Sequence, residues 1–260
     1  MNSLVLAKVV WREMLRRKDY YVLLILLVAM TAYLMSIDTF GVVAIERYLL
    51  DLGLLMIWVF SVVLAVTLTS RQIPNEERRG TIHALMAKPL SRLDFILGKF
   101  IGAWVAVCLA SLSFYAFLLA VVYLRGGQVG LVVLIQNWML FAVMLGVVSA
   151  ISLLFSTRMT YGAAATISFV AQWTIFALVP RIPVLIGYEH GLRANIMLVL
   201  YYMLPHYELF DLRRRLVHGW GALSAPVFLA ILLYGLLLIV LILTLAWLSY
   251  RRKMFMRGTT

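Results

Sequence analysis

Histidine and acidic side chains in the last third of the chain are the residues whose types would suit metal binding. They are Glu189, His190, His206, Glu208, Asp211 and His218. Their spacing matches neither H-E-x-x-H nor a comparable zinc-ligand motif, so polar residues of a solvated loop account for them better. Ser224, His218 and Asp211 have the types of a hydrolytic triad, but no nucleophile-elbow motif surrounds the serine. The sequence therefore predicts no catalytic residue and no metal site.

The sequence also gives no support for ATP binding by this chain or for ion-coupled transport. A phosphate-binding loop, G-x-x-x-x-G-K-[ST], is missing, because Gly98 and Lys99 lack both the upstream glycine and the following Ser or Thr. The long apolar segments contain no Asp, Glu, Lys, Arg or His, whereas ion-coupled transporters place such groups near the middle of the membrane. Cys108 is the single cysteine, so there is no intrachain disulfide and no cysteine-based zinc site. We expect no cofactor on this chain, and transport would be passive or driven from outside the membrane segment.

The elements that position these residues are predicted to be membrane helices. The chain is 64% hydrophobic and only 13% charged, with a mean hydropathy of +0.99, whereas a soluble domain carries about 25% charged residues. Six segments are long enough to cross a hydrocarbon layer of about 30 Å as helices. They are 20–37, 52–70, 100–124, 131–155, 161–179 and 227–250. Their uninterrupted apolar runs exclude the alternation of a membrane β-barrel, so the fold class is an all-α polytopic membrane protein.

The basic residues orient these six spans. With the N-terminus in the cytoplasm, sixteen of the 23 Lys and Arg residues fall on the cytoplasmic side. That bias follows the positive-inside rule and explains most of the formal net charge of +12 without any nucleic-acid partner. We therefore expect residues 1–260 to form one transmembrane domain in a bacterial or archaeal cytoplasmic membrane, with both termini cytoplasmic. Residues 71–99 would be cytoplasmic, and residues 181–226 would lie outside with short helices before the last span.

Residues 1–18 are predicted to form an amphipathic helix that lies along the membrane surface ahead of the first span. Apolar residues recur at helical spacing on one side, and bases occupy the other side. Trp11, Arg12, Arg16 and Arg17 are the residues expected to contact the membrane surface and its lipids. The alternative is a simple basic anchor that only fixes the orientation of the first span.

A charged run between the second and third spans has the pattern of a helix. Pro74 suits a first helical turn, and the acids that follow it lie where the backbone N–H groups are free. Ile82, Leu85 and Met86 share one face at helical spacing. Pro89 ends the helix soon after residue 87, and Ser91 has the position of an N-cap for a new helix that returns into the membrane. The sequence thus predicts a short cytoplasmic helix, a proline turn and a further helix.

The same run resembles the signature of permeases of type-2 ATP-binding-cassette (ABC) exporters. That signature reads E-x-x-x-G-T, then L-x-x-x-P-x-S-R, then G-K. The matching positions are Glu76, Gly80, Thr81, Leu85, Pro89, Ser91, Arg92, Gly98 and Lys99. A compound match over about 25 residues is more specific than a single short motif. The layout of six spans, a long outer segment before the sixth and a short basic tail also agrees.

The resemblance implies a function and a set of partners. In that family the glutamate-containing helix, called the coupling helix, docks in a cleft of a separate ABC ATPase subunit, which binds ATP and Mg and drives transport. The substrate path lies between two copies of the permease or between two related permeases. The ATPase-contacting residues would be Asn75, Glu76, Glu77, Arg78, Arg79, Gly80, Thr81 and Leu85. The turn and return into the membrane would be formed by Pro89, Ser91, Arg92, Gly98 and Lys99.

The outer segment contains a further predicted helix, 192–204, which is too short to span and is expected to be interfacial or re-entrant. In the resembling family such a segment caps the translocation path, whereas a plain surface helix is the alternative. Candidate path or cap residues are Gln172, Trp173, Tyr201 and Tyr202, although polar residues within spans more often join helices. An accessory protein on the outer side is a further candidate partner.

Two other function classes stay open at this point. A membrane subunit without transport activity would use the ATPase for signalling or for mechanical work on an outer-side protein. An integral-membrane enzyme acting on lipid-borne substrates would need a cluster of polar catalytic groups at one depth, and the sequence contains none that is convincing. The substrate class stays open: lipid, peptide, drug, saccharide and maturation factor all fit.

Overall fold

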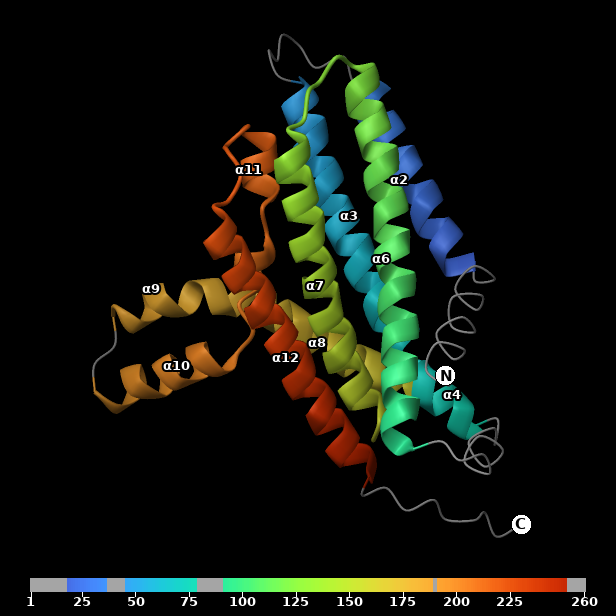
Figure 1. Ribbon diagram of the computed structural model, residues 1–260, viewed down its shortest axis with the longest axis vertical. Coiled ribbons are helices and arrows are strands. Elements are labelled where there is room, and N and C mark those ends of the chain that lie inside the picture. Colours follow the sequence, from blue (N-terminus) through green and yellow to red (C-terminus); the bar gives the residue numbers. More distant parts are fainter. Residues whose placement is uncertain (1–17, 37–44, 79–90, 189–190, 252–260) are drawn as a thin grey trace.

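The computed structural model describes residues 18–36, 45–78, 91–188 and 191–251, and these residues form helices joined by short turns, with no strand among them (Figure 1). Long helices make up most of the structure, in the order α2 (Lys18–Ser36), α3 (Ile45–Ser70), α6 (Arg92–Leu124), α7 (Leu131–Ser156), α8 (Tyr161–Leu178) and α12 (Ala225–Arg251). Shorter ones are α4 (Gln72–Arg78), η1 (Val179–Arg181), α9 (Ile182–Ile186), α10 (Leu192–Met203), η2 (Tyr207–Phe210) and α11 (Arg213–Val217). The all-α prediction is confirmed for this part of the chain.

Five stretches are long and apolar enough to cross a membrane: Arg47–Arg78, Arg92–Leu124, Leu131–Ser156, Tyr161–Ile186 and Ala225–Arg251. They correspond to the second to sixth predicted spans. The first predicted span is helix α2, but its described apolar part, Tyr20–Ala32, is shorter than the other five. The structure thus supports a polytopic membrane protein with these five spans, while the first predicted span, 20–37, stays a prediction. The predicted interfacial helix 1–18 lies, except for its last residue, outside the described residues.

Helix α7 lies at the centre of the bundle, where it contacts α3, α6, α8 and α12. Every residue from Leu140 to Leu153 is buried. Small residues make this close packing possible: a Cβ atom on Gly146 would lie 2.6 Å from the Ile239 side chain and 3.1 Å from the indole nitrogen of Trp104. Close approach of this kind at small residues is how helices associate in lipid, where the hydrophobic effect provides little attraction between them.

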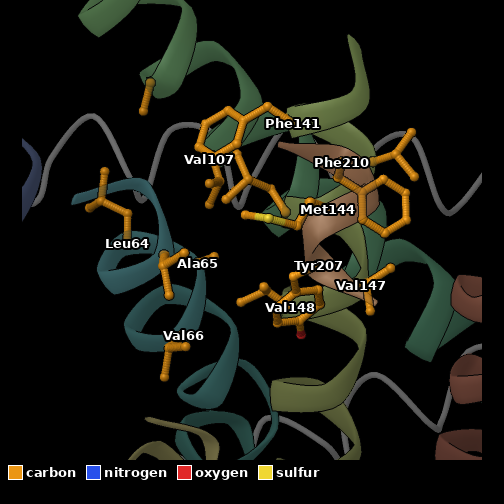
Figure 2. Packing of buried hydrophobic residues seen from close by; sticks show 14 of the residues in the cluster. Leu64, Ala65, Val66, Val107, Phe141, Met144, Val147, Val148, Tyr207 and Phe210 are labelled. Atoms are coloured by element: carbon orange, nitrogen blue, oxygen red, sulfur yellow. The ribbon is translucent and has the colours of Figure 1, made fainter. Parts of the chain in front are cut away.

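Part of the predicted outer segment contributes to this core. Tyr207 and Phe210 of η2 are buried, and Figure 2 shows them gathered with side chains of α3, α6 and α7. By contrast, no residue of α10 is buried, and the neighbouring helices α9 and α10 project away from the bundle in Figure 1. Residues 181–226, predicted as one outer segment with short helices, therefore contain two parts: a projecting helical hairpin and a part that inserts between the long helices.

Candidate functional site

The charged run after α3 begins as a bent continuation of that helix. Only Arg71 separates α3 from α4, and the Asn75 amide donates a hydrogen bond to the Arg71 carbonyl (3.1 Å). Pro74 has no N–H group, so the Ser70 carbonyl loses its usual helical donor and the helix bends there. Ile73 and Pro74 are buried, and α4 contacts α7. The helix thus begins at Gln72, two residues before the predicted start, and is described as far as Arg78.

An ion pair joins α4 to α6. Lys99 Nζ lies 2.7 Å from Glu76 Oε1, and the lysine is only 3% exposed. The ammonium group also lies 5.9 Å from the centre of the Phe95 ring. A buried ammonium group without its carboxylate is costly, so this pair fixes the distance between the two helices strongly. Both residues belong to the predicted signature, and the pair bridges the two ends of the segment 77–98.

The predicted N-cap of the returning helix is confirmed. Ser91 has extended backbone angles (φ −69°, ψ 149°), and its Oγ accepts a hydrogen bond from the Asp94 amide at 3.1 Å. The same hydroxyl donates to Asp94 Oδ2 at 2.7 Å. Because a free N–H group at the helix start is satisfied and a carboxylate lies at the positive end of the helix dipole, this arrangement defines where α6 begins.

Two arginines bind the C-terminal end of α12, which the sequence did not predict. Arg92 Nη1 donates to the Arg251 carbonyl (2.5 Å), and Arg158 Nη2 donates to the Ser249 carbonyl (2.7 Å). Tyr250 is fully buried, and its ring stacks on Phe95 with 5.8 Å between centroids. Positive side chains at the carbonyls of the last turn suit the negative end of a helix dipole. Arg92 therefore connects the end of the charged run to α12.

The structure brings together part of the predicted coupling site. Arg78 is exposed, Asn75 and Glu77 are partly exposed, and Gly98 is buried beside Lys99 on α6. The other predicted residues of the charged run and of the interfacial helix lie outside the described residues: Trp11, Arg12, Arg16, Arg17, Arg79, Gly80, Thr81, Leu85 and Pro89. Their roles stay predictions.

Of the candidate path residues, Gln172 joins two elements. It is buried, and its Oε1 accepts a hydrogen bond from the Tyr207 hydroxyl. Burial raises the pKa of Tyr207 above its ordinary value, so the hydroxyl keeps the proton that it donates. This is the interhelical role that the sequence offered as the commoner alternative. Trp173, by contrast, is 68% exposed on the outside of α8.

Helix α10 confirms the short helix predicted over 192–204. Tyr202 on it is exposed, whereas the Tyr201 ring meets His206 edge-on with 4.4 Å between centroids. The Tyr234 hydroxyl on α12 lies 3.1 Å from His206 Nδ1. Tyr201 and Tyr202 thus lie at the end of α10 next to α12, and the structure does not bring them together with Gln172 or Trp173 into one site.

A cavity of about 570 Å³ opens between α3, α8, η2 and α11. Its charged lining residues are Asp51, Glu208, Asp211, Arg213 and Arg214. Asp211 and Arg213 form an ion pair, with 2.6 Å between Arg213 Nη2 and Asp211 Oδ2. Trp58 and Phe176 form one wall, with 4.4 Å between their ring centroids. No local motif marks this cavity, because its lining comes from sequence positions more than a hundred residues apart.

Metal-ligand clusters are not found in the part of the chain that the structure describes: no three His, Cys, Asp or Glu side chains there are arranged to hold a metal ion. Of the six residues that prompted the zinc hypothesis, His206, Glu208, Asp211 and His218 are described, whereas 189 and 190 are not.

Comparison with known proteins gives a match over nearly the whole chain. The family model described as "ABC-2 family transporter protein" matches residues 4–254. No curated protein matches the sequence.

Proposed function

Because this chain belongs to the ABC-2 transporter family, and is therefore an integral-membrane permease subunit of an ABC transporter, we propose that it works as an exporter. In this proposal two permeases, identical or related, form the translocation path. A separate ABC ATPase binds ATP and Mg and drives the movement. The chain crosses a bacterial or archaeal cytoplasmic membrane six times, with α2 as the first span and both termini in the cytoplasm.

The observation that carries the coupling proposal is the ion pair between Glu76 and Lys99. This pair holds together the two ends of the segment 77–98, and Arg78 within that segment is exposed. A partner that pushes on this segment therefore moves α3 and α6 together, because the buried pair resists their separation. Arg92 extends the same connection to the end of α12.

The exposed apolar helices support assembly with lipids and a second permease. In the most apolar 18-residue part of each stretch, only 17% of Tyr161–Ile186 and 22% of Ala225–Arg251 is buried, against 83% of Leu131–Ser156. These outer helices offer the surface at which a second copy and membrane lipids can pack. Helix α7, by contrast, is enclosed by its own chain.

Copurification with the ATPase tests the coupling proposal. We would coexpress the permease with its cognate ABC ATPase and measure copurification and ATP hydrolysis for Arg78→Glu and Gly80→Trp. Reversing an exposed charge costs a few times the 0.2–1 kcal/mol of one rim ion pair, and a large side chain at Gly80 would clash with a close partner.

Arg181→Glu is the matched control, since Arg181 is also exposed but belongs to the outer segment. We expect both coupling variants to insert into the membrane but to lose the ATPase, and the control to keep it. If both variants copurify and hydrolyse ATP at the normal rate, the segment is only a solvated loop and the coupling proposal is wrong. Glu76 is unsuited to this test, because its reversal would also break the pair with Lys99.

A further inference from the structure

The cavity beside α3 lies at the depth of the outer half of the membrane. Tyr161, the first residue of α8, lies beside Arg71, whose guanidinium is 4.5 Å from its ring centre, so the end of α3 and the start of α8 lie at the same level, which is the cytoplasmic one in the proposed topology. At 1.5 Å per residue, Trp58 lies about 18 Å and Asp51 about 28 Å from the cytoplasmic end of α3 at Ser70. A hydrocarbon layer is about 30 Å thick. Trp58 therefore lies just outward of its middle and Asp51 near its outer surface, and the cavity that both residues line lies in the outer half.

The charges of this cavity are only partly matched within the chain. Asp211 and Arg213 satisfy each other through two parallel contacts, Nε to Oδ1 at 2.8 Å and Nη2 to Oδ2 at 2.6 Å. Asp51, Glu208 and Arg214 are exposed to the cavity and form no ion pair within the described part of the chain. Two carboxylates and one guanidinium thus remain to meet a ligand, which gives the cavity an excess of negative charge.

The deeper wall of the cavity is apolar and aromatic. Going inward along α3, Asp51 is followed by Leu55 and then by Trp58, which meets Phe176 of α8. The α3 and α8 lining is therefore charged at Asp51 and apolar from Leu55 to Trp58 and Phe176, while the Arg213 guanidinium, paired with Asp211, lies 5.7 Å from the centre of the Trp58 ring. The cavity volume of about 570 Å³ is within the range of small-molecule sites. A molecule that fits both ends has a charged head and an apolar tail, oriented like a lipid of the outer leaflet.

We propose that this cavity binds an amphiphile whose head carries an ammonium group, with Asp51 and Glu208 as its carboxylate partners. The apolar tail lies along Leu55, Trp58 and Phe176. Arg214 suits a phosphate next to the ammonium group, as in an amine-bearing phospholipid. A single-chain amine amphiphile has the same ammonium chemistry without the phosphate. The inference rests on the proposed function, since it takes α3 to begin on the outer side and the bound molecule to be a substrate.

Quenching of Trp58 fluorescence tests the site in the full-length chain without any ATPase. The chain is placed in phosphatidylglycerol nanodiscs that contain a small fraction of lipid with brominated acyl chains, headed by either ethanolamine or glycerol. Subtracting the signal of Trp58→Phe isolates the quenching of Trp58. We expect the ethanolamine lipid to quench at least threefold more effectively than the glycerol lipid. Each carboxylate changed to its amide should reduce this preference by roughly threefold.

The informative variant is Asp51→Asn combined with Glu208→Gln, which should remove the preference. Asp94→Asn at the start of α6, at the opposite end of the bundle, is the control and should leave it unchanged. Added dodecylammonium separates the two sources of the ligand. Stronger quenching by the ethanolamine lipid, relieved by the amine, identifies the phospholipid. Equal quenching by both lipids, relieved by the amine, identifies the single-chain amine. Equal quenching by both brominated lipids without competition by the amine, or a preference that survives the double amide variant, overturns the proposal.

Failure of this test is distinguishable from failure of the proposed function. Binding is measured on the permease alone, whereas the coupling proposal depends on copurification with the ATPase. A chain that binds the ATPase but shows no ammonium preference keeps its transporter role and loses only this ligand class.

Discussion

The ion pair between Glu76 and Lys99 makes a prediction that separates structural coupling from surface charge. Lys99 is 3% exposed, and the side chain of Glu76 is 23% exposed. Changing Glu76 to Gln leaves the ammonium group of Lys99 buried with a neutral partner. Changing Lys99 to Met as well removes the buried charge and fills a similar volume with an apolar chain.

The expected magnitude follows from these exposures. Breaking a buried pair by removing one partner costs about 3–5 kcal/mol, whereas replacing both partners by apolar groups is close to neutral. Because the carboxylate is partly exposed, we expect the lower end, about 3 kcal/mol, for Glu76→Gln. The double variant Glu76→Gln/Lys99→Met should regain about 2 kcal/mol of that loss. The loss for Glu76→Gln would then lie well above the 0.2–1 kcal/mol that exposed pairs contribute.

Thermal unfolding of the purified chain in nanodiscs is the assay, with Arg78→Gln as the control. At roughly 2–4 °C per kcal/mol for a chain of this size, Glu76→Gln should lower Tm by about 6–12 °C. The exposed Arg78 should change stability by less than about 0.5 kcal/mol. If Glu76→Gln shifts Tm no more than the control, or if the double variant is less stable than Glu76→Gln, the Glu76–Lys99 ion pair does not hold α4 and α6 together.

Three further predictions address topology and packing. In a Cys108→Ala background, cysteines at positions 80 and 191 should label from opposite sides of the membrane in intact cells, and labelling of both from outside would contradict the six-span arrangement. Gly235→Leu should cost at least about 1–3 kcal/mol in thermal unfolding, because its Cβ would lie 2.3 Å from Val143 and 2.8 Å from Phe210. Gln136→Leu should speed protease cleavage of the outer segment, since Gln136 exchanges hydrogen bonds of 2.9 and 3.0 Å with the backbone of Leu223; unchanged cleavage would mean that these bonds do not hold the segment.

Features that depend on local chemistry were predictable from the sequence. Apolar length alone identified five helices that match to within about ten residues at each end, and the hydroxyl of Ser91 identified the start of α6. The predicted start at Pro74 was two residues late, because a proline fits any position of the first turn and α3 leads into α4 almost without a break. The N-terminal end of α3 also lies further back than the predicted span, at Ile45.

Features that depend on tertiary contact could not be predicted in this way. Arg158 had only a topological meaning in the sequence, yet it binds the end of α12 more than ninety residues further on. Asp51 lay just outside a predicted span and Asp211 in an irregular segment, so neither pointed to a shared cavity. The two acids meet at one cavity because η2 inserts into the core. A four-residue helix such as η2 is too short to leave a periodic pattern in the sequence.

The density of charge between the second and third spans reflects two separate tasks. Glu76 and Lys99 are turned inward and held by each other, and Ser91 and Asp94 define the start of α6. None of these four groups needs a partner subunit to explain its presence. Arg78 is different, because it is exposed and forms no ion pair or side-chain hydrogen bond with the residues that the structure describes. A loop that only joined two membrane helices would need the first set of charges but not the second. The proposed docking of a soluble subunit is therefore best tested at Arg78. A change of Arg78 leaves the Glu76–Lys99 ion pair intact, whereas a change of Glu76 would alter docking and stability together.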